Sequence, residues 1–171
     1  LPIVTCAILL GWHYAKRLPW KFDARVLLGM LAESVVWGGL LWTFFWSWSK
    51  LIGGTSNTSF DVAQLFGFMG AGIYEELLFR VLLLLGVAAV VHQAGAPKQA
   101  SLTTGLLVSS VLFALAHYDR IVTGGSASNW IGVVFYGLCG VYLGTLFSFR
   151  GFGITAATHA LYNVLVMCLR V

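Results

Sequence analysis

Charged residues are scarce in this sequence. Asp, Glu, Lys and Arg make up 9% of its 171 residues, whereas 59% are hydrophobic. A soluble globular domain has about 25% charged residues. The shortage therefore argues against an ordinary soluble domain.

The sequence also lacks the common cysteine and zinc motifs. Its cysteines, Cys6, Cys139 and Cys168, stand singly in apolar runs and form no Cys-x-x-Cys pair. Isolated cysteines of this kind act as small buried hydrophobic side chains. No His-Glu-x-x-His motif of the zinc proteases is present.

Alternation of polar and apolar residues, the mark of membrane β-strands, is missing as well. The hydrophobic runs are continuous, and most approach the ~20 residues that a transmembrane helix needs. We therefore expect an all-α, polytopic transmembrane bundle of about six segments, surrounded by a lipid bilayer. The runs are Leu1–Trp12 (incomplete), Val26–Trp48, Phe60–Val91, Leu102–Ala116, Trp130–Phe149 and Phe152–Leu169.

The net charge of +4 does not indicate nucleic-acid binding. Lys16, Arg17, Lys21 and Arg25 gather in one connection beside aromatic residues. Basic loops next to transmembrane helices mark the cytoplasmic side, and aromatic residues lie at the membrane interface. We expect this loop to be a cytoplasmic anchor.

Charged residues cluster within one of the hydrophobic runs. The stretch GAGIYEELLFRVLLLL, residues 70–85, contains Glu75, Glu76 and Arg80. Ionisable residues at membrane depth are costly and by default mark function. Glu76 and Arg80 are four residues apart and share a helix face, whereas Glu75 points elsewhere. A purely structural ion cluster is the alternative, but it leaves Glu75 without a partner of its own.

Two later segments supply partners for Glu75. His117 ends the stretch FALAH, residues 113–117, and HALYN, residues 159–163, holds His159 and Asn163 one turn apart. Helical bundles build sites from side chains on facing helices. We expect these four side chains to meet.

Together these motifs resemble those of the CAAX-processing and bacteriocin-processing (CPBP, or Abi) intramembrane proteases. Glu-Glu-x-x-x-Arg, Phe-x-x-x-His and His-x-x-x-Asn follow one another in this order, over about Phe60–Arg170. The family includes the type II CAAX prenyl endopeptidases and lysostaphin-resistance-protein-A-like proteins. One departure is Val81, where the family commonly has Gly. The resemblance implies a protease core at 60–171, preceded by transmembrane segments and the basic loop at 1–59.

The resemblance also implies roles for the motif residues. Glu75 and His117 would activate the hydrolytic water, and His159 with Asn163 would stabilise the oxyanion. Glu76 and Arg80 would orient the first carboxylate. The implied substrate is a membrane-associated protein or peptide, in some cases prenylated, and we expect the enzyme in a bacterial cell membrane.

No cofactor is expected, although zinc is an alternative. Glu75, His117 and His159 have the His₂Glu composition of some catalytic zinc sites. However, the sequence offers neither histidine an obvious second carboxylate, which most zinc-bound histidines have. We therefore favour a metal-free site.

Two other functions remain open on the residues alone. A transporter or channel would use Glu75, His117 and His159 as a proton or cation relay, although no inverted repeats are evident. A non-catalytic membrane scaffold or immunity protein would keep the fold without the chemistry.

Overall fold

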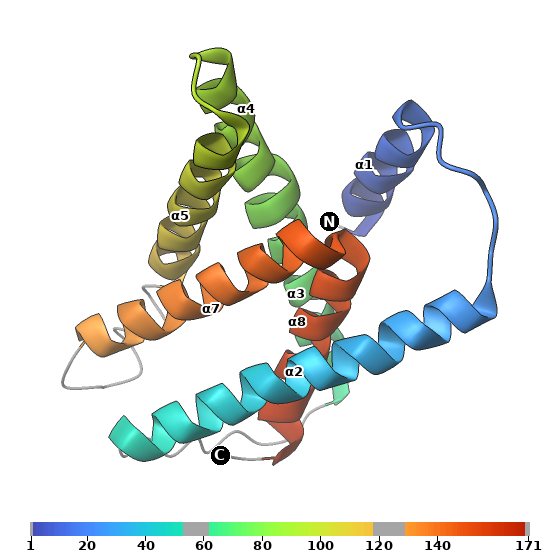
Figure 1. Ribbon diagram of the computed structural model, residues 1–171. Helices are drawn as coiled ribbons and strands as arrows, with labels where there is room; N and C mark the ends of the chain where they lie inside the picture. The colour runs from blue at the N-terminus through green and yellow to red at the C-terminus, as the bar shows by residue number, and fades with distance from the viewer. Residues whose placement is uncertain (1, 53–61, 118–128, 170–171) are drawn as a thin grey trace.

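The computed structural model describes residues 2–52, 62–117 and 129–169. Within these ranges the chain is helical and contains no β-strand (Figure 1). The all-α prediction is therefore confirmed. The elements are α1 (Pro2–Ala15), α2 (Ala24–Ile52), α3 (Val62–Glu76), the π-helix η1 (Leu77–Leu84), α4 (Leu85–Gln93), α5 (Lys98–Ala116), α7 (Asn129–Arg150) and α8 (Phe152–Leu169).

Several helices can cross a membrane. Among the described residues, four are long and apolar enough: Ala24–Leu51, Lys98–Ala116, Trp130–Arg150 and Phe152–Leu169. α1 is a shorter apolar helix. α3, η1 and α4 follow one another without a break, in place of the predicted run 60–91. The protein is therefore an integral membrane protein, and the count of about six segments agrees with its helices.

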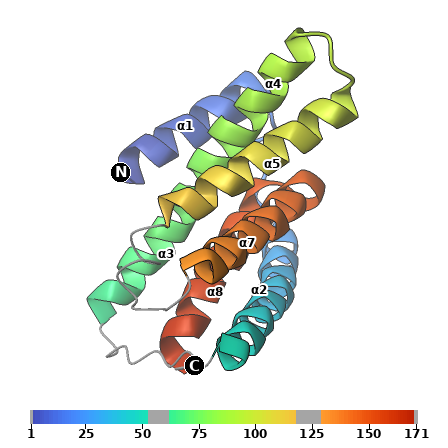
Figure 2. The same ribbon diagram turned by 90° about the vertical axis from the view of Figure 1, so that its left-hand side faces the viewer.

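α8 lies at the centre of the bundle. It packs against α2 on one side and α3 on the other, and α7 crosses near its start (Figures 1 and 2). α5 packs along both α7 and α4, whereas α1 lies at the edge beside α3. Many large apolar side chains on the outer faces are exposed, such as Leu28, Val35 and Val111. An apolar outer surface suits contact with lipid.

The buried core joins α2, η1, α5 and α7. Its cluster consists of Leu41, Phe79, Phe113, Phe135, Cys139 and Leu143. Of the three cysteines, only Cys139 is buried as expected. Cys6 and Cys168 are exposed, because they lie on the outward faces of their helices.

A glycine brings α5 and α7 close together. A Cβ atom at Gly140 would lie 2.9 Å from the Cα atom of Ser110. Small residues allow such close approach between membrane helices. Gly140 therefore has a packing role between these two helices.

An ion pair that the sequence did not suggest joins α2 to the end of α7. Arg150 Nε donates to Glu33 Oε1 at 2.6 Å, and Trp37 Nε1 donates to the same oxygen at 3.1 Å. Ser34 Oγ donates to Ile154 O at 3.3 Å on the neighbouring turn of α8. These contacts fasten α2, which forms one wall of the site. The expected boundary between 1–59 and 60–171 lies outside the described residues.

Candidate active site

The two adjacent carboxylates stand where the helix changes type. Glu75 and Glu76 end α3, and the π-helix η1 begins at Leu77. π-Helical turns are rare and occur often at functional sites. The two carboxylates have different environments, since the Glu75 side chain is 20% exposed and that of Glu76 is completely buried.

Glu76 forms the ion pair that its spacing predicted. Its Oε2 atom lies 3.0 Å from Arg80 Nε, and both side chains are completely buried. A buried charge needs such a partner, because the interior of the bundle does not solvate it as water would.

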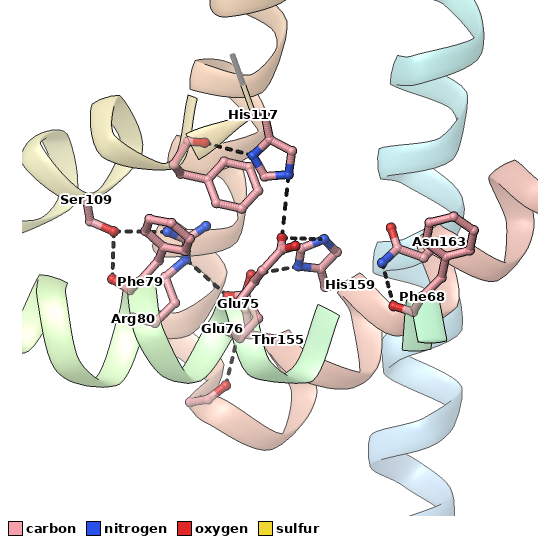
Figure 3. Close-up of polar contacts among 12 residues, drawn as sticks. Phe68, Glu75, Glu76, Phe79, Arg80, Ser109, His117, Thr155, His159 and Asn163 are labelled. Atoms are coloured by element: carbon pink, nitrogen blue, oxygen red, sulfur yellow. Dashed lines mark hydrogen bonds and ion pairs between the residues drawn. The ribbon is translucent and has the colours of Figure 1, made fainter. Parts of the chain in front are cut away.

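Glu76 also holds a histidine. His159 Nδ1 lies 2.8 Å from Glu76 Oε1, across the interface of α3 and α8 (Figure 3). The expectation that neither histidine has a second carboxylate is therefore wrong for His159. The two residues are 83 positions apart, so only the packing of the helices brings them together.

Glu75 faces both histidines of the site. Its Oε2 atom lies 3.7 Å from His117 Nε2 and 3.8 Å from His159 Nε2 (Figure 3). Its side chain is 20% exposed, in contrast to that of Glu76. Of the four side chains expected to meet, these three therefore lie together.

The hydrogen bonds assign the protons of the two imidazoles. His117 Nδ1 lies 2.8 Å from Phe113 O, a carbonyl that can only accept, so this nitrogen carries a proton. His159 Nδ1 likewise donates to the carboxylate of Glu76. In the neutral rings both Nε2 atoms therefore present lone pairs toward Glu75. His159 can donate to an oxyanion only when it carries a second proton.

Aromatic rings fix the plane of His117. Tyr136 stacks on it, with ring centroids 4.4 Å apart and an interplanar angle of 17°. Phe113 lies 4.5 Å away at 44°. Tyr136 was not found from the sequence, where it is one of many aromatic residues in an apolar run.

Asn163 lies one turn beyond His159 on α8. Its Nδ2 atom donates to Phe68 O at 3.0 Å. The side chain amide has two N–H bonds, so a second donor is available in addition to this contact. Gly72 on α3 makes room for it, because a Cβ there would lie 3.2 Å from Asn163 Nδ2.

These residues line one cavity of about 290 Å³. Glu75, His117, His159 and Asn163 contribute its polar groups. Its walls also include the aliphatic and aromatic side chains of Leu41, Phe45, Phe135, Tyr136 and Tyr162. The cavity can therefore hold an apolar group beside a polar reaction centre.

The sequence left open that Glu75, His117 and His159 bind zinc. Their donor atoms face one another, and the composition suits zinc. Nevertheless, within residues 2–52, 62–117 and 129–169 no three His, Cys, Asp or Glu side chains are arranged to hold a metal ion.

A membrane bundle in which carboxylates and histidines meet around a cavity has the architecture expected of an intramembrane protease. The chain matches the family described as type II CAAX prenyl endopeptidase Rce1-like over residues 57–165. It belongs to this family, and the matched range includes every motif residue discussed above. At the family level it is thus a CAAX-type intramembrane protease with a membrane-associated protein substrate. Searches of curated proteins and of solved structures give no match.

Proposed function

We propose that the protein is an endopeptidase in which Glu75 activates the attacking water. The position of Glu75 supports this proposal most strongly. Its Oε2 atom lies within 4 Å of two imidazole nitrogens, at 3.7 and 3.8 Å, beside the cavity. A general base must lie within reach of the water and of a group that carries the proton onward.

The chemistry begins with proton transfer from water to Glu75. The oxygen attacks the carbonyl carbon of the scissile peptide bond, and a tetrahedral intermediate forms. His117 receives the proton at Nε2 and delivers it to the departing amine, after which the C–N bond breaks. Its hydrogen bond to Phe113 O keeps Nε2 directed at Glu75.

The negatively charged oxygen of the tetrahedral intermediate needs hydrogen-bond donors to stabilise it. Asn163 offers its amide, and His159 offers Nε2–H when the ring is doubly protonated. Glu76 fixes the orientation of this ring, because its carboxylate accepts from Nδ1 at 2.8 Å. Fixed donors aimed at a developing oxyanion are among the largest contributions to catalysis.

The mechanism uses no metal. Glu75 supplies the base and His117 the proton transfer. Zinc held by Glu75, His117 and His159 is the alternative. A chelator test distinguishes the zinc-dependent mechanism from the metal-free one.

The substrate is a membrane-associated protein or peptide. The aromatic walls of the cavity suit an apolar segment next to the scissile bond, and the family description points to prenylated chains as one substrate class. We place the enzyme in a bacterial cell membrane.

One observation favours a second candidate, a proton relay for transport. The ionisable side chains form a connected series from Arg80 through Glu76, His159 and Glu75 to His117. Such series occur in pumps and transporters. A non-catalytic scaffold would carry the same series without any turnover.

Cleavage in heavy-oxygen water distinguishes these functions. The purified protein is incubated with a membrane-anchored peptide, and the products are analysed by mass spectrometry. We expect the new C-terminal carboxylate to contain one solvent oxygen, and Glu75→Gln to form no product. Proton flux in proteoliposomes without cleavage would favour the relay, and the absence of both would favour a scaffold.

A further inference from the structure

Ser109 on α5 contacts η1 through one buried hydroxyl. Its Oγ atom donates to Phe79 O at 2.7 Å and accepts from Arg80 Nη1 at 3.0 Å (Figure 3). The side chain is completely buried. One hydroxyl therefore holds both the backbone of η1 and its arginine.

Arg80 connects Ser109 to the candidate active site, because its guanidinium contacts both Ser109 and Glu76. Its guanidinium is planar and rigid, so Nη1 and Nε cannot move independently. Nη1 meets Ser109, and Nε meets Glu76 Oε2 at 3.0 Å. The opposite oxygen of Glu76 holds His159.

The π-helix makes an external anchor useful. At its end the backbone N–H of Leu85 bonds to Arg80 O, five residues earlier. π-Helical turns are rarer than α-helical turns and are often kept at functional sites. A hydroxyl from α5 on the carbonyl of Phe79 fixes this turn from outside the segment.

We propose that Ser109 is a positioning residue for His159. It sets the orientation of Arg80, and through Arg80 and Glu76 it aligns the imidazole with Glu75. This inference rests on the proposed function. It concerns a residue that touches neither the cavity nor the proposed reacting atoms.

The neighbouring Ser110 provides a matched control. It is also buried, at 3% exposure, and its Oγ donates to Leu106 O at 2.7 Å within α5 itself. Ser110→Ala removes a buried hydroxyl from the same helix without removing the cross-helix contact to η1. Any difference between the two variants thus reports on that contact.

The kinetic experiment compares Ser109→Ala, Ser110→Ala and the unchanged full chain on a membrane-anchored peptide. Misplacement of a catalytic group lowers turnover, and a displacement near 1 Å can cost about 100-fold, so a partial displacement costs about 10- to 100-fold. We expect kcat of Ser109→Ala to fall by about that factor, with KM changed less than about twofold. Ser110→Ala should change neither. An unchanged kcat in Ser109→Ala, or an equal fall in both variants, would overturn the proposal.

A second measurement is independent of proteolysis. Nuclear magnetic resonance of isotope-labelled histidine in micelles reports the proton on His159 Nδ1. We expect its resonance to shift in Ser109→Ala and to stay unchanged in Ser110→Ala. If the unchanged protein cleaves nothing, the proposed function fails, yet this resonance still decides the role of Ser109. An unshifted resonance in folded Ser109→Ala would refute that role, and Ser109→Cys, a weaker donor of similar size, replaces Ser109→Ala if the latter does not fold.

Discussion

His159 Nδ1 lies 2.8 Å from Glu76 Oε1, and the other oxygen of that carboxylate lies 3.0 Å from Arg80 Nε. A proposed catalytic histidine and a buried ion pair are thus joined into one unit. Glu75, the residue directly before Glu76, lies outside this pair and faces the cavity. The two adjacent carboxylates therefore have different tasks.

Glu76→Gln should reduce stability. The change leaves the guanidinium of Arg80 buried without its anion, and breaking one side of a buried pair costs about 3–5 kcal/mol. Thermal unfolding in matched detergent measures the loss, with Glu75→Gln as the control. Equal losses in the two variants would contradict the division of tasks.

Gly72→Ala should lower activity. A Cβ at this position would lie 3.2 Å from Asn163 Nδ2 and 3.3 Å from Ala160 N, so α8 must shift beside His159. A displacement near 1 Å can cost about 100-fold in rate, and we expect a smaller loss here, because these neighbours need to move by only a few tenths of an ångström. Gly70→Ala is the matched control, since a Cβ there would meet nothing within 4 Å. Steady-state cleavage by both variants provides the measurement, and equal activity would show that the close approach at Gly72 does not matter.

Asn163→Ala should lower kcat by about 10²–10³, the usual loss for one oxyanion donor. KM should change much less, because the donor acts mainly in the transition state. Asn163→Asp should also be damaging when its carboxylate is ionised, since a negative group would then face the growing negative charge. The assay is steady-state cleavage of a membrane-anchored peptide. Near-normal turnover in Asn163→Ala would remove this residue from the mechanism.

His117→Ala and His159→Ala should each abolish turnover, and chelators should leave the unchanged enzyme active. Loss of either imidazole removes a proton carrier or an oxyanion donor from the metal-free mechanism. Metal analysis of active purified protein accompanies the chelator assay. Inactivation by a chelator with recovery on added zinc, or stoichiometric tightly bound metal, would instead support the His₂Glu zinc site.

Much of the fold follows from sequence because the bilayer imposes simple rules. Hydrophobic length predicted the helices, and the spacing of Glu76 and Arg80 predicted their pair. Motif order predicted which helices carry the site. These features depend on local sequence or on a family pattern, and both are visible in one chain.

Contacts between distant helices were not predictable in the same way. The bond between Glu76 and His159 depends on how α3 packs against α8, and that packing depends on the space left at Gly72. Ser109 and Ser110 are identical residues in the same apolar run. Only the contact of Ser109 with the π-helix distinguishes them. A single sequence contains no signal for such pairings.

The most direct test of the central claim is turnover by Glu75→Gln in a folded protein. Glutamine keeps the size of the side chain but cannot accept the proton of water as a carboxylate does. Cleavage of a membrane-anchored peptide is measured beside thermal unfolding in the same detergent. The account predicts no detectable turnover with an unfolding temperature close to that of the unchanged protein. Substantial cleavage by folded Glu75→Gln would contradict the assignment of Glu75 as the base.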